Sequence, residues 1–176
     1  MKTQKTDEIQ KIIENHKFVN LDIGGALDPQ KDFIILDERD HPNVDIRHSF
    51  QDFPYPLPDD SIDLIKTANV VERISRENKT FIKFMDELWR ILKPERQLAI
   101  ATYYAGSSMF YQDPCNVNPC NETTWAYFDP LETQTGGVLY KLHRPKPWKI
   151  ITISFSQNGI MEVLLEKRRI DVSYSK

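Results

Sequence analysis

The sequence has few cysteines and no long apolar run. Only 2 of its 176 residues are cysteine. No stretch approaches the roughly 20 apolar residues that a membrane-spanning helix needs. The first ten residues, MKTQKTDEIQ, are too polar for a secretory signal peptide. We therefore expect a cytoplasmic protein that has no membrane partner.

The two cysteines, Cys115 and Cys120, lie in a loop rich in Pro and Asn. A zinc site would need further ligands nearby, and the closest histidine in sequence, His143, is far along the chain. A disulfide between the two is not expected in a reducing compartment. The sequence therefore predicts two reduced thiols and no metal site.

The chain also lacks a strong overall charge. Its formal net charge is −3 and its pI is near 5.8, so nothing draws it globally toward nucleic acid. Five basic residues nevertheless gather in a local run: Lys141, His143, Arg144, Lys146 and Lys149. Solvated surface is the simpler interpretation of this run, and an anionic substrate, such as a nucleic acid or a phosphorylated sugar, is the alternative.

Short apolar runs alternate with helical patterns over the first hundred residues. An amphipathic helix is predicted over 4–16, and a longer one has an apolar stripe from Phe81 to Leu92 and ends at Lys93-Pro94. Only residues 24–32 separate the first two strands, so a turn or a helical stub must make that crossing. This alternation predicts an α/β fold with a doubly wound, mainly parallel sheet. The strands are predicted at 18–23, 33–37, 44–47, 61–67 and 97–101.

The second half of the chain lacks this alternation of strands and helices. Residues 103–135 are expected to be irregular, apart from a short helix at 122–128 behind Asn121. The aromatic residues crowded there are either core or a wall of a substrate pocket. The runs 148–155 and 160–169 flank Asn158-Gly159 and predict an antiparallel hairpin. Together these segments predict one domain over 1–176, with an N-terminal helix (1–17), a ligand-binding core (18–101), substrate-side loops (102–147) and a C-terminal hairpin (148–176).

The first two strands end in residues suited to a polar ligand. Gly24 and Gly25 follow the first strand, and Asp37 ends the second. Because the carboxyl ends of strands hold ligands in open α/β sheets, the glycine backbone and this carboxylate are expected to meet there. A carboxylate at this place can accept hydrogen bonds from a ribose. A bend that needs glycine and a turn-capping aspartate are the alternatives that involve no ligand.

Several motifs occur in the order found in one known family. They are LDIGG (21–25), LD (36–37), FPYPLPDDSID (53–63), ANVVERI (68–74) and ELWRILKP (87–94). Together they resemble the class I S-adenosylmethionine-dependent methyltransferases, in the small branch with a shortened first crossover. Asp113-Pro114 and the run WAYF (125–128) are similar to the substrate-side loop of that branch.

The resemblance implies a Rossmann-like methyltransferase fold and an S-adenosylmethionine site. Its cofactor-binding residues would be Asp22, Gly24, Gly25, Ala26, Asp37, Ser49, Phe50 and Asn69. Ser49 stands where the family often has an acid that contacts the adenine, with Asp52 as a displaced candidate. Asn69 and Arg73 replace the two histidines of the family's "SHVLEHI" stretch.

The implied activity is methyl transfer to a small or carbohydrate-like acceptor. Asp113 and Glu72 are the candidate catalytic residues, with His143 as a further candidate base. The departures at Ser49, Asn69 and Arg73 support an alternative, namely a non-catalytic binding or assembly protein that keeps the fold. Dinucleotide redox chemistry is disfavoured, since the glycines lack the spacing GxGxxG.

Overall fold

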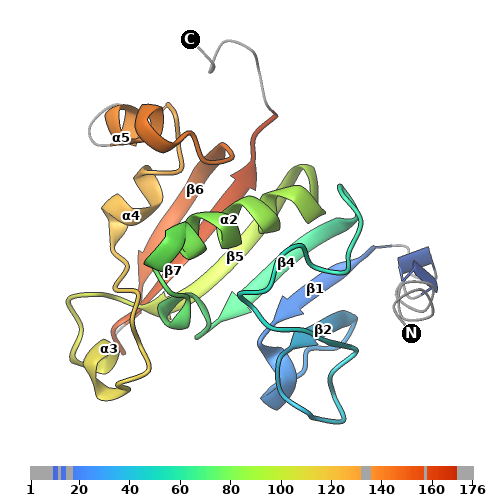
Figure 1. Cartoon of the computed structure of the whole chain (residues 1–176). Helices are drawn as coiled ribbons and strands as arrows, with labels where there is room; N and C mark the ends of the chain where they lie inside the picture. The colour runs from blue at the N-terminus through green and yellow to red at the C-terminus, as the bar shows by residue number, and fades with distance from the viewer. Residues whose placement is uncertain (1–9, 12, 15–17, 132–135, 157, 170–176) are drawn as a thin grey trace.

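One seven-stranded sheet organises the molecule (Figure 1). The computed structural model describes residues 10–11, 13–14, 18–131, 136–156 and 158–169. The strand order is β3-β2-β1-β4-β5-β7-β6; the first five strands are parallel, and β7 runs antiparallel to both β5 and β6. The predicted α/β class with a mainly parallel sheet is confirmed. The strands are β1 (Asn20–Ile23), β2 (Phe33–Asp37), β3 (Ile46–Arg47), β4 (Ile62–Ala68), β5 (Leu92–Tyr103), β6 (Trp148–Phe155) and β7 (Ile160–Lys167).

One face of the sheet carries the core. Leu21, Ile65, Leu98 and Leu165 lie side by side across four neighbouring strands, and all four are buried. Helix α2 (Thr80–Ile91) crosses the sheet in Figure 1 and contributes Phe84, Met85 and Leu88 to the same core cluster. Burying this apolar area is the main favourable term for folding. It also holds the carboxyl ends of β1, β2 and β4 in fixed positions.

The crossing between β1 and β2 is made by the short 3-10 helix η1 (Gly25–Leu27), which confirms the predicted helical stub. Two more 3-10 turns, η2 (Val71–Arg73) and η3 (Glu77–Lys79), lie between β4 and α2. The helix predicted over 4–16 lies mostly outside the described residues, of which 10, 11, 13 and 14 are helical.

The segment predicted to be irregular contains more helix than expected. Helix α4 (Glu122–Ala126) was predicted and has a reciprocal cap between Asn121 and Thr124. Helix α3 (Ser108–Gln112) was not predicted, and its start is capped by the Ser107 side chain, which accepts from the Met109 N–H. Helix α5 (Gly136–His143) was also missed. Short helices of this kind depend on such caps and on tertiary packing more than on periodicity.

Strand β5 starts earlier than expected. It begins directly after α2, because Leu92 already pairs with Ile62 of β4; the chain then turns at Glu95 (φ 62°), and the pairing continues from Gln97 after a register shift. The C-terminal hairpin is confirmed, with Gly159 at φ 72° in its turn. A side chain on Gly159 would stand 2.1 Å from Ser107 Oγ, so the hairpin turn packs directly on the start of α3. No helix among the described residues is long and apolar enough to span a membrane.

Candidate functional site

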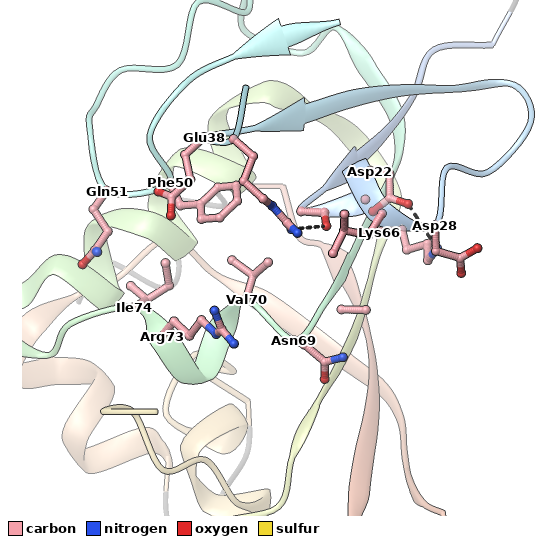
Figure 2. A pocket seen from close by; sticks show the side chains of 15 residues that line it. Asp22, Asp28, Glu38, Phe50, Gln51, Lys66, Asn69, Val70, Arg73 and Ile74 are labelled. Carbon is pink, nitrogen blue, oxygen red and sulfur yellow. Dashed lines mark hydrogen bonds and ion pairs between the residues drawn. The ribbon is translucent and has the colours of Figure 1, made fainter. Parts of the chain in front are cut away.

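A cavity of about 550 Å³ opens at the carboxyl ends of β1 and β4 (Figure 2). Its size falls in the range of small-molecule sites, and its place at the strand ends is where open α/β sheets bind ligands. The lining residues are Asp22, Gly24, Gly25, Leu27, Asp28, Glu38, Arg39, Phe50, Gln51, Lys66, Ala68, Asn69, Val70, Arg73 and Ile74. We call it the strand-end cavity.

The two glycines after β1 form its closest backbone approach. Gly24 has φ 89°, and its N–H donates to the Leu36 carbonyl at 2.9 Å. A Cβ on Gly24 would lie 2.4 Å from Val70 Cγ2, and one on Gly25 would lie 2.5 Å from the Asp22 carboxylate. Lack of space requires glycine at both positions, and the positive φ requires it at Gly24 as well. Both glycines line the strand-end cavity.

An ion pair lies beside these glycines. Lys66 Nζ on β4 donates to Asp22 Oδ2 on β1 at 3.1 Å. Burial of the Asp22 carboxyl raises its pKa, and the hydrogen bond and charge of Lys66 oppose that shift. Lys66 neutralises the buried carboxylate while part of its own side chain stays exposed to the cavity. Lys66 was not among the predicted site residues.

Asp37 does not line the strand-end cavity. Its buried carboxylate accepts hydrogen bonds from the Ala26 N–H (3.3 Å), the Arg39 N–H (3.0 Å) and Arg39 Nε (3.0 Å). Burial favours the neutral acid, but the hydrogen bonds and charge of Arg39 outweigh it and lower the pKa of Asp37. Arg39 also reaches the Gly24 carbonyl at 3.2 Å. Arg39 therefore bridges the ends of β1 and β2.

The neighbouring carboxylate is the one that faces the cavity. Glu38 lines it and is exposed, and within the described part of the chain it makes no hydrogen bond or ion pair. Sequence reasoning missed Glu38 because the resemblance pointed to the acid that ends the strand. Ala26, predicted from the same resemblance, is buried and uses its N–H on Asp37.

The far wall follows β3 and β4. Phe50 lines the cavity as predicted, and its carbonyl accepts from the Tyr55 hydroxyl at 2.8 Å. Ser49 and the displaced candidate Asp52 do not line it, whereas Gln51 does. Asn69 also lines it as predicted, in a left-handed conformation (φ 54°) that ends β4.

The two predicted catalytic residues have different environments. The buried Glu72 carboxylate accepts from Thr102 Oγ1 at 2.8 Å, and burial raises its pKa. It lines none of the cavities described here. Asp113 is partly exposed and pairs with Arg73 Nη2 at 2.7 Å, so it reaches the strand-end cavity through an arginine that lines it. The backbone N–H of Cys115 and the charge of Arg73 lower the pKa of Asp113.

The predicted substrate-side loops contribute to a neighbouring cavity. This one, of about 770 Å³, lies at the carboxyl end of β5 and against the β6–β7 turn. Its lining contains aromatic, hydroxyl and amide side chains and no charged residue: Tyr103, Tyr104, Ser107, Ser108, Met109, Phe155, Ser156, Asn158, Gly159 and Ile160. Other aromatic residues of the loop, namely Phe110, Trp125 and Phe128, are buried. These three aromatic residues therefore belong to the core, while Tyr103 and Tyr104 line this cavity.

No protein-family model and no curated protein matches this sequence. Solved structures do match its fold. A methyltransferase of Aquifex aeolicus described as S-adenosylmethionine-dependent has a TM-score of 0.51 at 16% identity, over 92% of this chain and 89% of that one. The YcgJ protein of Bacillus subtilis has a TM-score of 0.54 at 16% identity, over 93% and 99%.

A third similar structure is an RNA-modifying enzyme crystallised with S-adenosylmethionine. It is the 16S rRNA (adenine(1408)-N(1))-methyltransferase of Catenulisporales acidiphilia, with a TM-score of 0.58 at 10% identity, over 93% of this chain and 92% of that one. The chain therefore has the Rossmann-like fold of the class I S-adenosylmethionine-dependent methyltransferases.

Proposed function

We propose that this protein binds S-adenosylmethionine in the strand-end cavity and transfers its methyl group to a small or carbohydrate-like acceptor. The observation that carries the proposal is the cavity of about 550 Å³ at the carboxyl ends of β1 and β4, which Gly24 and Gly25 line. Open α/β sheets bind ligands at this place, and glycines there let the backbone approach a polar ligand closely. The lining also offers the Phe50 ring and the Glu38 carboxylate, and these groups fit the parts of this cofactor.

Within this proposal, each side of the cavity has its own role. The backbone of Gly24 and Gly25 flanks the methionine part, and Phe50 offers an apolar wall to the adenine. The geometry favours Glu38 for the ribose hydroxyls, because the Asp37 carboxylate already accepts hydrogen bonds from Ala26 and Arg39. Asp37 can serve the ribose only if Arg39 withdraws from it.

The bound cofactor supplies an electrophilic methyl group on its sulfonium. The protein's part is then to hold the acceptor in line and to exclude water. Asp113 fits an orienting role better than that of a base, because its lowered pKa makes it a weak proton acceptor. Glu72 fits a positioning role: its carbonyl accepts from the N–H groups of Val117 and Asn118, which ties the substrate-side loop to η2.

The uncharged cavity beside β5 supports the choice of acceptor. Its hydroxyl and amide groups can hydrogen-bond sugar hydroxyls, and aromatic rings such as Tyr104 and Phe155 offer apolar surface. It lies at the carboxyl end of β5, next to the end of β4, where the Asn69 N–H donates to the Ala101 carbonyl at 3.0 Å. An acceptor held there would approach the cofactor from the side of β4.

Calorimetric titration with S-adenosylmethionine and S-adenosylhomocysteine tests the cofactor site. We expect saturable binding of both, and weaker binding to Glu38→Gln than to Glu77→Gln, an exposed matched control that does not line the cavity. Transfer of a labelled methyl group into a panel of neutral sugars then tests the activity. If neither S-adenosylmethionine nor S-adenosylhomocysteine binds, the proposal is refuted.

A non-catalytic binding or assembly protein is the second candidate. The observation that favours it is Arg39, which covers Asp37 and contacts the Gly24 carbonyl. In this candidate the Arg39 side chain, which lines the strand-end cavity, fills space that the cofactor would need. Arg39→Ala should then create S-adenosylmethionine binding that the parent protein lacks, whereas a catalytic parent binds without this change.

A further inference from the structure

A separate cavity of about 390 Å³ lies between the start of α2, helix α4 and the end of α5. In Figure 1 the start of α2 lies beside α4. Its lining residues are Arg76, Lys79, Phe81, Ile82, Thr123, Thr124, Tyr127, Phe128 and His143. We call it the α2–α4 cavity. It shares no lining residue with the strand-end cavity.

The charge of its lining is one-sided. Two cations and a histidine face this space, and no lining residue is acidic. Among the residues that the structure describes, no carboxylate lies within 4.0 Å of the charged nitrogens of Arg76, Lys79 or His143. The strand-end cavity differs, since each of its three basic side chains has a carboxylate partner: Lys66 with Asp22, Arg39 with Asp37 and Arg73 with Asp113.

The guanidinium of Arg76 is held in place by neutral groups. Its Nε donates to Asn118 Oδ1 at 2.5 Å, and its Nη2 donates to the Pro119 carbonyl. These bonds occupy two of its five N–H donors and leave its positive charge uncompensated. A cation fixed in this way binds an anion with little loss of side-chain entropy.

Aromatic side chains lie beside the basic ones. The ring of Tyr127 lies 6.3 Å from that of His143, and Phe81 packs edge-on against Phe128 at 5.6 Å. His143 belongs to the basic run of the sequence, and it is the member of that run that lines this cavity, together with Lys79. The cavity thus combines basic side chains with aromatic ones.

We propose that the α2–α4 cavity binds the phosphate group of a small phosphate monoester. A phosphate offers several acceptor oxygens to the three basic side chains, and its charge compensates the cations of Arg76 and Lys79, which have no carboxylate partner among the described residues. The volume, near the lower end of the small-molecule range, suits a single sugar phosphate or nucleoside monophosphate rather than a polymer. The proposal is independent of methyl transfer, because binding is measured without the cofactor.

The test is calorimetric titration of the full chain at low and moderate salt. The probes are inorganic phosphate, ribose 5-phosphate, unphosphorylated ribose and a ten-nucleotide single-stranded RNA. The test variants are Lys79→Gln and His143→Gln, which remove the positive charge of Lys79 and the imidazole of His143 from exposed positions. Lys83→Gln is the matched control, since Lys83 is exposed on α2 and does not line the cavity. Thermal unfolding of each variant checks that the fold is retained.

We expect ribose 5-phosphate to bind at least about tenfold more tightly than ribose, because charge-assisted hydrogen bonds are the strong ones. The double variant Lys79→Gln with His143→Gln should lose this preference, and Lys83→Gln should keep it. Equal binding of ribose and ribose 5-phosphate would overturn the proposal. So would ribose 5-phosphate binding that the double variant leaves unchanged, or RNA binding that is tighter and insensitive to the double variant.

Discussion

Replacing Asp37 by alanine is expected to cost stability, because the structure uses this carboxylate internally. The side chain is fully buried, and it accepts from the Ala26 N–H, the Arg39 N–H and Arg39 Nε. Its loss leaves the buried Ala26 N–H without a partner, which costs about 1–3 kcal/mol. The Arg39 side chain is 44% exposed, so water compensates for most of its loss and that term is at most about 1 kcal/mol.

Asp37→Ala should therefore lower the free energy of unfolding by about 1–4 kcal/mol. For a chain of this size that corresponds to a fall in Tm of about 2–16 °C. Urea denaturation followed by circular dichroism measures the difference. Glu38→Gln is the matched control, and we expect it to change stability by less than about 0.5 kcal/mol, since Glu38 is exposed and makes no hydrogen bond.

The same two variants should separate folding from binding. Glu38→Gln should weaken S-adenosylmethionine binding by about tenfold or more, because a charged hydrogen bond to the cofactor is lost. Asp37→Ala should mainly lower the stability of the fold. The pKa of Asp37 is lower in the folded state than in the unfolded state. The ionised carboxylate therefore contributes fully to the stability of the fold above the unfolded pKa of about 3.9, and this contribution is lost as the pH falls through the folded pKa. An Asp37→Ala protein as stable as its parent would refute this reasoning, as would unchanged binding in Glu38→Gln.

Three further outcomes are expected. Asp63→Ala should cost about 1–3 kcal/mol in urea denaturation, since the carboxylate accepts from the N–H of the buried Val19 at 3.0 Å; Asp63→Asn, which keeps an acceptor oxygen, should cost less. Gly24→Ala should lower Tm, because φ 89° is strained for alanine and the Cβ would meet Val70. Burial raises the folded pKa of Glu72, so its ionisation opposes folding as the pH rises above the unfolded value of about 4.3. Glu72→Gln should therefore remove the part of the fall in stability that begins as the pH rises above this unfolded value, and a steeper fall in Glu72→Gln would contradict this.

The sequence by itself determined the order and kind of most elements. Strand β2 has the predicted bounds, and strands β1 and β4 differ from prediction by one or two residues. Asn158-Gly159 marked the hairpin turn correctly. These features follow from local rules, because side-chain periodicity and positive φ depend on residues close together in the chain.

The same local rules located part of the candidate site. Gly24 and Gly25 had to follow a buried strand, and a strand end in a parallel sheet is where cavities open. Asp22, Phe50 and Asn69 also line the strand-end cavity as expected. The glycine motif after β1 therefore predicted where the backbone lines the strand-end cavity.

Only the tertiary structure decided which side chains face the cavity. Lys66 meets Asp22 across 44 positions, and Arg73 meets Asp113 across 40, and no spacing in the sequence signals either pair. Glu38 rather than Asp37 faces the cavity, because Arg39 folds back onto the carboxylate that ends β2. His143 lines the α2–α4 cavity together with Lys79, because the fold brings the end of α5 near the start of α2. Such contacts depend on strand register and helix packing, which bring distant residues together and have no local pattern of their own.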